Sequence, residues 1–204
     1  MNVFYNKEHI GDVLLVQLAT ESIVNTVVER AGDIAILKEA QTGEIKAFNL
    51  FNASQYVQTE AKGLVEVTPE LVEQLAAAIE KNGANISLDV DFSPKFVIGF
   101  VATKEKHPNA DKLSICSVNV GDETLQIVCG APNVEAGQKV VVAKIGAVMP
   151  SGMLIKEGNL RGVDSFGMLC SARELAIPNA PSEKGILVLP EDAIVGSAFE
   201  SPSK

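Results

Sequence analysis

The sequence predicts a mostly β protein in which a small α+β domain is followed by a small closed β-barrel. Short runs rich in β-branched residues alternate with Gly, Pro and Asn turns along most of the chain, and we find one segment with helical periodicity. A polar stretch precedes the second half, where short strands separated by Gly and Pro turns begin. We therefore expect a domain at residues 1–85, a linker at 86–95 and a second domain at 96–200.

In the first domain, apolar or β-branched runs predict short strands. These runs are residues 13–18, 24–28, 33–37 and 45–50. Thr68 and Pro69 then begin a helix, because threonine caps a helix N-terminus and proline suits the first turn. Apolar residues recur on one face of this helix, which ends at Asn82 and Gly83. We find no catalytic or ligand-binding motif in this domain.

The second domain reads as short strands separated by Gly and Pro turns. The expected strands are residues 96–101, 113–120, 125–129, 139–144 and 185–190. Five short strands with long irregular connections are typical of a small closed barrel. The pattern alone does not separate one small barrel fold from another.

The chain is acidic, and its charge is unevenly distributed. The 204 residues carry a formal net charge of −9, with 6 basic and 13 acidic side chains in residues 1–89 and 11 basic and 13 acidic in residues 90–204. Attraction to phosphate needs local positive charge, so these counts argue against a non-specific nucleic-acid binder. If RNA binds, we expect it on a local basic patch of the second domain, with modest affinity and strong salt dependence.

Composition also bears on the compartment and on metal binding. No uncharged apolar run approaches the roughly 18 to 20 residues of a membrane helix, and the first residues lack the layout of a signal peptide. Three scattered cysteines, Cys116, Cys129 and Cys170, and two histidines give no metal-ligand spacing. We expect a cytoplasmic protein with free thiols, no metal, no cofactor and no membrane association.

Three linked motifs in the second domain are more specific than the strand pattern. Residues 106–113 read KHPNADKL, residues 127–134 read IVCGAPNV and residues 159–171 read NLRGVDSFGMLCS. In order and spacing they resemble the tRNA-binding OB domain found near the N-terminus of the phenylalanyl-tRNA synthetase β chain. The resemblance covers about residues 94–200 and implies a five-stranded OB-fold barrel. With its short acidic first domain, the whole chain resembles the YtpR family of stand-alone tRNA-binding proteins.

The resemblance implies binding of tRNA by shape and backbone, chiefly at its outer corner, and no catalysis. This agrees with the physics of A-form RNA, whose deep and narrow groove hides the base edges from side chains. An aminoacyl-tRNA synthetase or another protein, and a second copy of the chain, stay open as further partners.

Candidate tRNA-binding residues come from the three motifs and from basic residues near them. They are Lys106, His107, Lys112, Asn133, Lys144, Lys156, Arg161, Ser165, Met168, Ser171 and Arg173. Arg161 offers a planar fork that suits phosphate, and the resemblance links the Ser-x-x-Met signature of Ser165 and Met168 to tRNA contact. Several alternatives stay open. Asn109 and Asp111 would shape a turn, Met168 would be core, and Arg161 would pair with Asp164.

Two other functions compete with tRNA binding. A protein-interaction module that has lost RNA binding would agree with the acidic charge, and a surviving basic patch would distinguish the two functions. An enzyme would need a nucleophile such as Cys129 with a partner base, and His107 is the histidine available in this half. The second domain has phenylalanine but no Trp or Tyr, so we expect base stacking on aromatic rings to contribute little.

Overall fold

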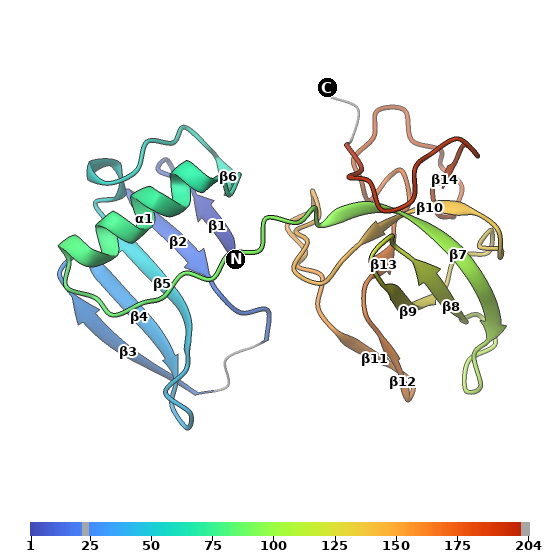
Figure 1. Cartoon of the computed structure of the whole chain (residues 1–204), viewed down its shortest axis with the longest axis horizontal. Coiled ribbons are helices and arrows are strands. Elements are labelled where there is room, and N and C mark those ends of the chain that lie inside the picture. Colours follow the sequence, from blue (N-terminus) through green and yellow to red (C-terminus); the bar gives the residue numbers. More distant parts are fainter. Residues whose placement is uncertain (22–24, 201–204) are drawn as a thin grey trace. The chain divides into compact units, whose positions relative to one another are not determined.

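The computed structural model describes residues 1–21 and 25–200 (Figure 1). They form two compact units, Met1–Ser93 and Pro94–Lys204, whose boundary lies within the expected linker. The strand expected at residues 24–28 begins at Val24, which lies outside the described residues. Among the described helices, none is long and apolar enough to cross a membrane.

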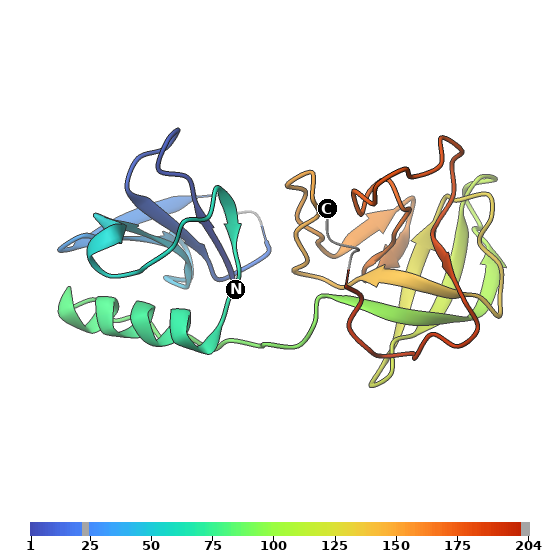
Figure 2. The ribbon, with the colours of Figure 1, turned by 90° about the horizontal axis from the view of Figure 1, so that it is seen from above.

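The first unit is an antiparallel sheet with one helix against it. The strand order is β3-β4-β5-β2-β1-β6, and α1 (Pro69–Lys81) lies against one face (Figure 2). The strands are β1 (Asn2–Tyr5), β2 (Val13–Gln17), β3 (Thr26–Ala31), β4 (Ile34–Glu39), β5 (Ile45–Phe51) and β6 (Gly63–Val65). A short 3-10 helix, η1 (Ala53–Gln55), follows β5. The sequence pattern did not predict β1 and β6, which are short and pair with each other.

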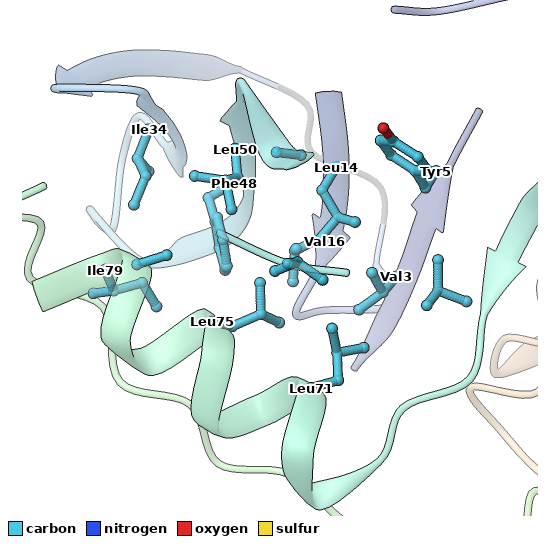
Figure 3. Packing of buried hydrophobic residues seen from close by; sticks show 14 of the residues in the cluster. Val3, Tyr5, Leu14, Val16, Ile34, Phe48, Leu50, Leu71, Leu75 and Ile79 are labelled. Atoms are coloured by element: carbon cyan, nitrogen blue, oxygen red, sulfur yellow. The ribbon is translucent and has the colours of Figure 1, made fainter. Parts of the chain in front are cut away.

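The core of the first unit lies between the sheet and α1 (Figure 3). Along β2, Leu14 and Val16 are fully buried while their neighbours are half-buried, as expected for a sheet with one covered face. Leu71 and Leu75 of α1 point into this layer from the helical spacing that the sequence predicted. Burying one such aliphatic side chain contributes about 1.5–3 kcal/mol to folding.

Side chains at both ends of α1 satisfy backbone groups that the helix leaves unpaired. The Thr68 hydroxyl accepts a hydrogen bond from the Leu71 amide at 3.2 Å. At the other end, the Asn82 side chain donates to the Ala78 carbonyl at 2.8 Å and accepts from the Asp33 amide at 2.8 Å. Asn82 therefore both caps the helix and joins its end to the turn between β3 and β4.

Removing the N-terminal cap of α1 should destabilise the first unit. We expect Thr68→Ala to lower the free energy of unfolding by about 1 kcal/mol, because the Leu71 amide loses its acceptor. Urea unfolding followed by the helical circular-dichroism signal measures this change. Thr68→Ser keeps a hydroxyl and should keep wild-type stability, so equal losses in both variants would contradict the capping role.

The second unit is a barrel built on a five-stranded antiparallel sheet. The strand order is β13-β10-β7-β8-β9, β14 also pairs with β10, and β11 and β12 form a separate hairpin. The strands are β7 (Phe96–Lys106), β8 (Ser114–Asn119), β9 (Thr124–Cys129), β10 (Lys139–Ala143), β11 (Gly158–Leu160), β12 (Val163–Ser165), β13 (Met168–Leu169) and β14 (Val188–Leu189). The expected strand at 185–190 is thus shortened to two residues.

The region of β12 brings the two edges of this sheet together. The Val128 amide of β9 donates to the Ser165 hydroxyl at 3.0 Å, and the Phe166 amide donates to the Gln126 carbonyl at 2.9 Å. The Gln126 side chain adds a bond to the Asp164 carbonyl at 2.8 Å. These bonds nearly close the sheet on itself. The expected mostly β fold class, with an OB-like barrel in the second half, is therefore confirmed.

Candidate nucleic-acid interface

The hairpin of β11 and β12 turns through two residues with positive φ. Arg161 has φ 50° and Gly162 has φ 91°, as in the type I′ turns that match the twist of paired strands. The Gly162 amide donates to the Asn159 side chain at 2.9 Å, and Asn159 donates to the Asp164 carboxylate at 2.6 Å. Asp164 is thus engaged by Asn159 rather than by Arg161.

A buried histidine joins the loop between β7 and β8 to this hairpin. His107 is 1% exposed, and its Nδ1 accepts from the Asn109 amide at 3.0 Å. Its Nε2 lies 2.9 Å from the Leu160 carbonyl, so Nε2 donates to that carbonyl while Nδ1 is the acceptor. Asn109 also donates to the Arg161 carbonyl at 3.1 Å, and the Arg161 guanidinium donates to the Asn109 carbonyl at 3.3 Å.

The loop and the hairpin together carry basic side chains at one end of the barrel. Lys106 pairs with Asp111 at 3.2 Å, and both side chains are so exposed that the pair contributes little. Lys112 has no ion-pair partner among the described residues, and Arg161 donates to a carbonyl rather than to a carboxylate. We call Lys106, Lys112 and Arg161, with the loop and turn that hold them, the loop–hairpin surface.

A groove of about 670 Å³ lies beside this surface. The end of β9 and residues 130–133 form one wall, residues 168–174 a second and residues 181–188 a third. The groove brings together four predicted site residues, Asn133, Met168, Ser171 and Arg173. A methyl group placed on Gly130 would lie 3.2 Å from Leu113 of the loop, so the groove adjoins the loop–hairpin surface.

Two of the predicted polar residues in the groove bond within the protein. The Asn133 amide donates to the Ile186 carbonyl at 3.0 Å and accepts from the Ile186 amide at 2.9 Å. Ser171 and Glu174 form a reciprocal pair, in which the Ser171 hydroxyl donates to the carboxylate at 2.7 Å and accepts from the Glu174 amide at 3.2 Å. These bonds fix the walls of the groove.

The charged groups at the groove differ in their hydrogen-bond and ion-pair partners. The Arg173 guanidinium donates to the Ser182 carbonyl at 3.2 Å and the Pro181 carbonyl at 3.4 Å, which are neutral acceptors. Lys184 has no ion-pair partner in the part of the chain that the structure describes. Glu183 also lines the groove. Among the described residues, neither Arg173 nor Lys184 therefore forms an ion pair with a carboxylate.

The Ser-x-x-Met signature divides between the inside and the outside of the barrel. Ser165 is 4% exposed, and its hydroxyl accepts from the Val128 amide and donates to the Gly167 carbonyl at 3.2 Å. Met168 is half-buried and lines the groove. Ser165 thus closes the barrel, and Met168 is the half of the signature that a ligand can reach.

Two basic residues of the predicted set, Lys144 and Lys156, belong neither to the loop–hairpin surface nor to the lining of the groove. Lys144 follows β10 beside the start of β7, whereas the loop–hairpin surface lies at the end of β7. It pairs with Glu123 at 2.8 Å and Asp122 at 3.9 Å. Lys156 is exposed just before β11. The structure adds Lys184, which lines the groove but lies in none of the three motifs.

The three thiols are buried in the barrel. Burial raises the pKa of Cys129, that of Cys116 to about 11 and that of Cys170 to about 12. Within the described ranges, no group of three or more His, Cys, Asp and Glu side chains is placed to hold a metal ion.

We expect the native protein to resist thiol reagents at pH 8. A pKa raised by burial leaves little thiolate at that pH, and burial also blocks the reagent. Reaction with a chromogenic disulfide reagent should be slow in buffer and should consume all three thiols rapidly in urea. Rapid labelling of the native protein would contradict the burial seen here.

The chain joins an α+β unit to an OB-like barrel that carries basic groups around one loop end, which is the class of protein that the fold and the candidate site define. The family described as "Putative tRNA binding domain" matches residues 96–198, and that described as "Domain of unknown function (DUF4479)" matches residues 22–91.

The chain belongs to the YtpR family. It is 55% identical over 200 residues to "Putative tRNA-binding protein YtpR" of Bacillus subtilis, covering 98% of this chain and 100% of that protein. It is 52% identical over 134 residues to the phenylalanine–tRNA ligase beta subunit of Oceanobacillus iheyensis, covering 62% of this chain but 16% of that subunit. A solved MetRS related protein from Pyrococcus horikoshii is 22% identical over 52% of this chain and 88% of that one, with a TM-score of 0.39.

Proposed function

We propose that this protein binds tRNA through its second unit and catalyses no reaction of its own. The observation that carries the proposal is the set of three cations, Lys112, Arg161 and Arg173, around one end of a barrel of the "Putative tRNA binding domain" family. None of the three has a carboxylate partner among the described residues. The name of the Bacillus relative, which matches over its whole length, supports the same function.

The arrangement supports recognition of tRNA backbone and shape rather than of a sequence. Cations on a projecting turn and loop can reach phosphates across a shallow groove, whereas they cannot read bases hidden in A-form RNA. We propose the outer corner of tRNA as the contact, with Lys106, Lys112 and Arg161 on phosphates. His107 and Ser165 are proposed to position these groups, because their polar atoms are already bonded within the protein.

The same geometry supports a binding role without catalysis, and we propose a cytoplasmic location, where thiols stay reduced. The thiols have raised pKa values, and both ring nitrogens of His107 are occupied by hydrogen bonds. The barrel, which we expected at residues 96–200, is proposed as the RNA-binding domain. The acidic first domain is then free for another partner, such as a synthetase or a second copy of the chain.

Fluorescently labelled tRNA distinguishes this function from a protein-interaction module. The purified chain should bind tRNA more tightly than an unstructured RNA of equal length, at low and at physiological salt. About three phosphate contacts predict a slope of log affinity against log salt of roughly −2 to −3. Equal affinity for both RNAs at low salt would overturn the proposal and favour a protein partner.

A further inference from the structure

We infer that the groove beside the loop–hairpin surface is a subsite for one unpaired nucleotide of the bound RNA. The inference rests on the proposed function and adds a ligand class to a site that the family description does not specify. Its volume of about 670 Å³ lies within the range of small-molecule sites, which is about 300–1,000 Å³.

The apolar part of the groove suits the face of a base. Met168 is half-buried at the groove, and Val188 of β14 is 42% exposed although it is a large aliphatic residue. Methionine is flexible and polarisable, so it adapts to flat rings without an aromatic platform. An unstacked base is the part of an RNA that gains most from such a contact, because paired bases in a helix are already covered.

The charged part of the groove suits the phosphate and the base edge of the same nucleotide. Arg173 reaches only carbonyls at 3.2 and 3.4 Å, and a phosphate would give its fork a stronger, charge-assisted partner. Lys184 adds a second cation. Glu174 is already engaged by Ser171, whereas Glu183 is an acceptor for an amino group on a base edge.

The part of the groove wall formed by Asn133 and Ile186 is held in place before any ligand binds. Asn133 bonds both the amide and the carbonyl of Ile186, and Gly185 packs so closely that an added Cβ would lie 2.7 Å from the Asn133 Oδ1. A preformed wall lowers the ordering cost of binding. Since Gly130 joins the groove to the loop, one RNA can contact the phosphate-binding surface and insert a nucleotide here.

A charge placed on the groove wall tests this subsite. In the full chain, Val188→Glu should weaken tRNA binding about tenfold, as loss of a single-base contact predicts. Ile194→Glu is the matched control, because Ile194 is 73% exposed, belongs to the same unit and does not line the groove. It adds the same charge and should change tRNA affinity less than twofold. Neither variant should change binding of a blunt-ended RNA duplex.

The outcomes separate the subsite from the proposed function. If the wild-type chain binds tRNA and the two variants bind it with equal affinity, the subsite is overturned and tRNA binding is left intact. Failure of the wild-type chain to bind tRNA would overturn the proposed function instead. If Val188→Glu fails to fold, an NMR titration of the wild-type chain with a single-stranded tetranucleotide replaces it as the test. Amide shifts at Gly130 and Gly185 support the subsite, and their absence overturns it.

Discussion

Replacing Lys112 and Arg161 together with alanine should weaken tRNA binding about thirtyfold at low salt, equivalent to about 1 kcal/mol for each lost phosphate contact. The slope of log affinity against log salt should also become shallower by about 1.5, because two fewer counterions are released. Stability should stay near that of the wild type, since both side chains are exposed.

A matched variant separates local contact from net charge. Lys7 and Lys62 are exposed cations of the first unit, and replacing both with alanine changes the net charge by the same amount. This control should keep wild-type affinity and salt dependence in the same fluorescence titration. Equal losses in the two double variants would show that the cations of the loop–hairpin surface are not the contact.

His107→Leu should lower the free energy of unfolding of the second unit by about 3 kcal/mol. Leucine fills similar space, but it leaves the Asn109 amide and the Leu160 carbonyl without partners. These groups lose their partners at a buried site, since the wild-type ring is 1% exposed. The turn that carries Arg161 also loses its anchor, so tRNA affinity should fall although no phosphate contact is removed.

Urea unfolding monitored by NMR methyl signals of the second unit measures this loss. His9→Leu is the control, since His9 is exposed and lies in the first unit. It should leave these signals and the tRNA affinity unchanged. A His107→Leu protein as stable as the wild type would mean that the buried hydrogen bonds do not hold the loop to the hairpin.

Most of the barrel could be predicted from the sequence, because its strands are periodic runs ended by turn residues. The run at residues 113–120 became β8 with one residue less at each end. The sequence pattern did not predict β11 and β12, since each strand has only three residues. In addition, an arginine occupies a turn position with positive φ, where Gly or Asn is usual.

The candidate site was less predictable, because motifs do not reveal which way a side chain points. His107 and Ser165 are polar residues within the motifs that predict RNA binding, yet both lie inside the unit and bond to backbone groups. Asn133 holds Ile186, which is 53 residues away in the chain. Lys144 follows a barrel strand, but its end of the barrel is set by pairing of β10 with β7.

Amide hydrogen exchange of the full chain, with and without saturating tRNA, tests the central claim most directly. We predict slower exchange in residues 106–113, 128–133, 159–162, 168–174 and 181–188, which make up the loop–hairpin surface and the groove. Exchange in β1 to β6 of the first unit should stay unchanged. Protection confined to the first unit, or no protection under conditions where tRNA is bound, would contradict the assignment of the interface to this end of the barrel.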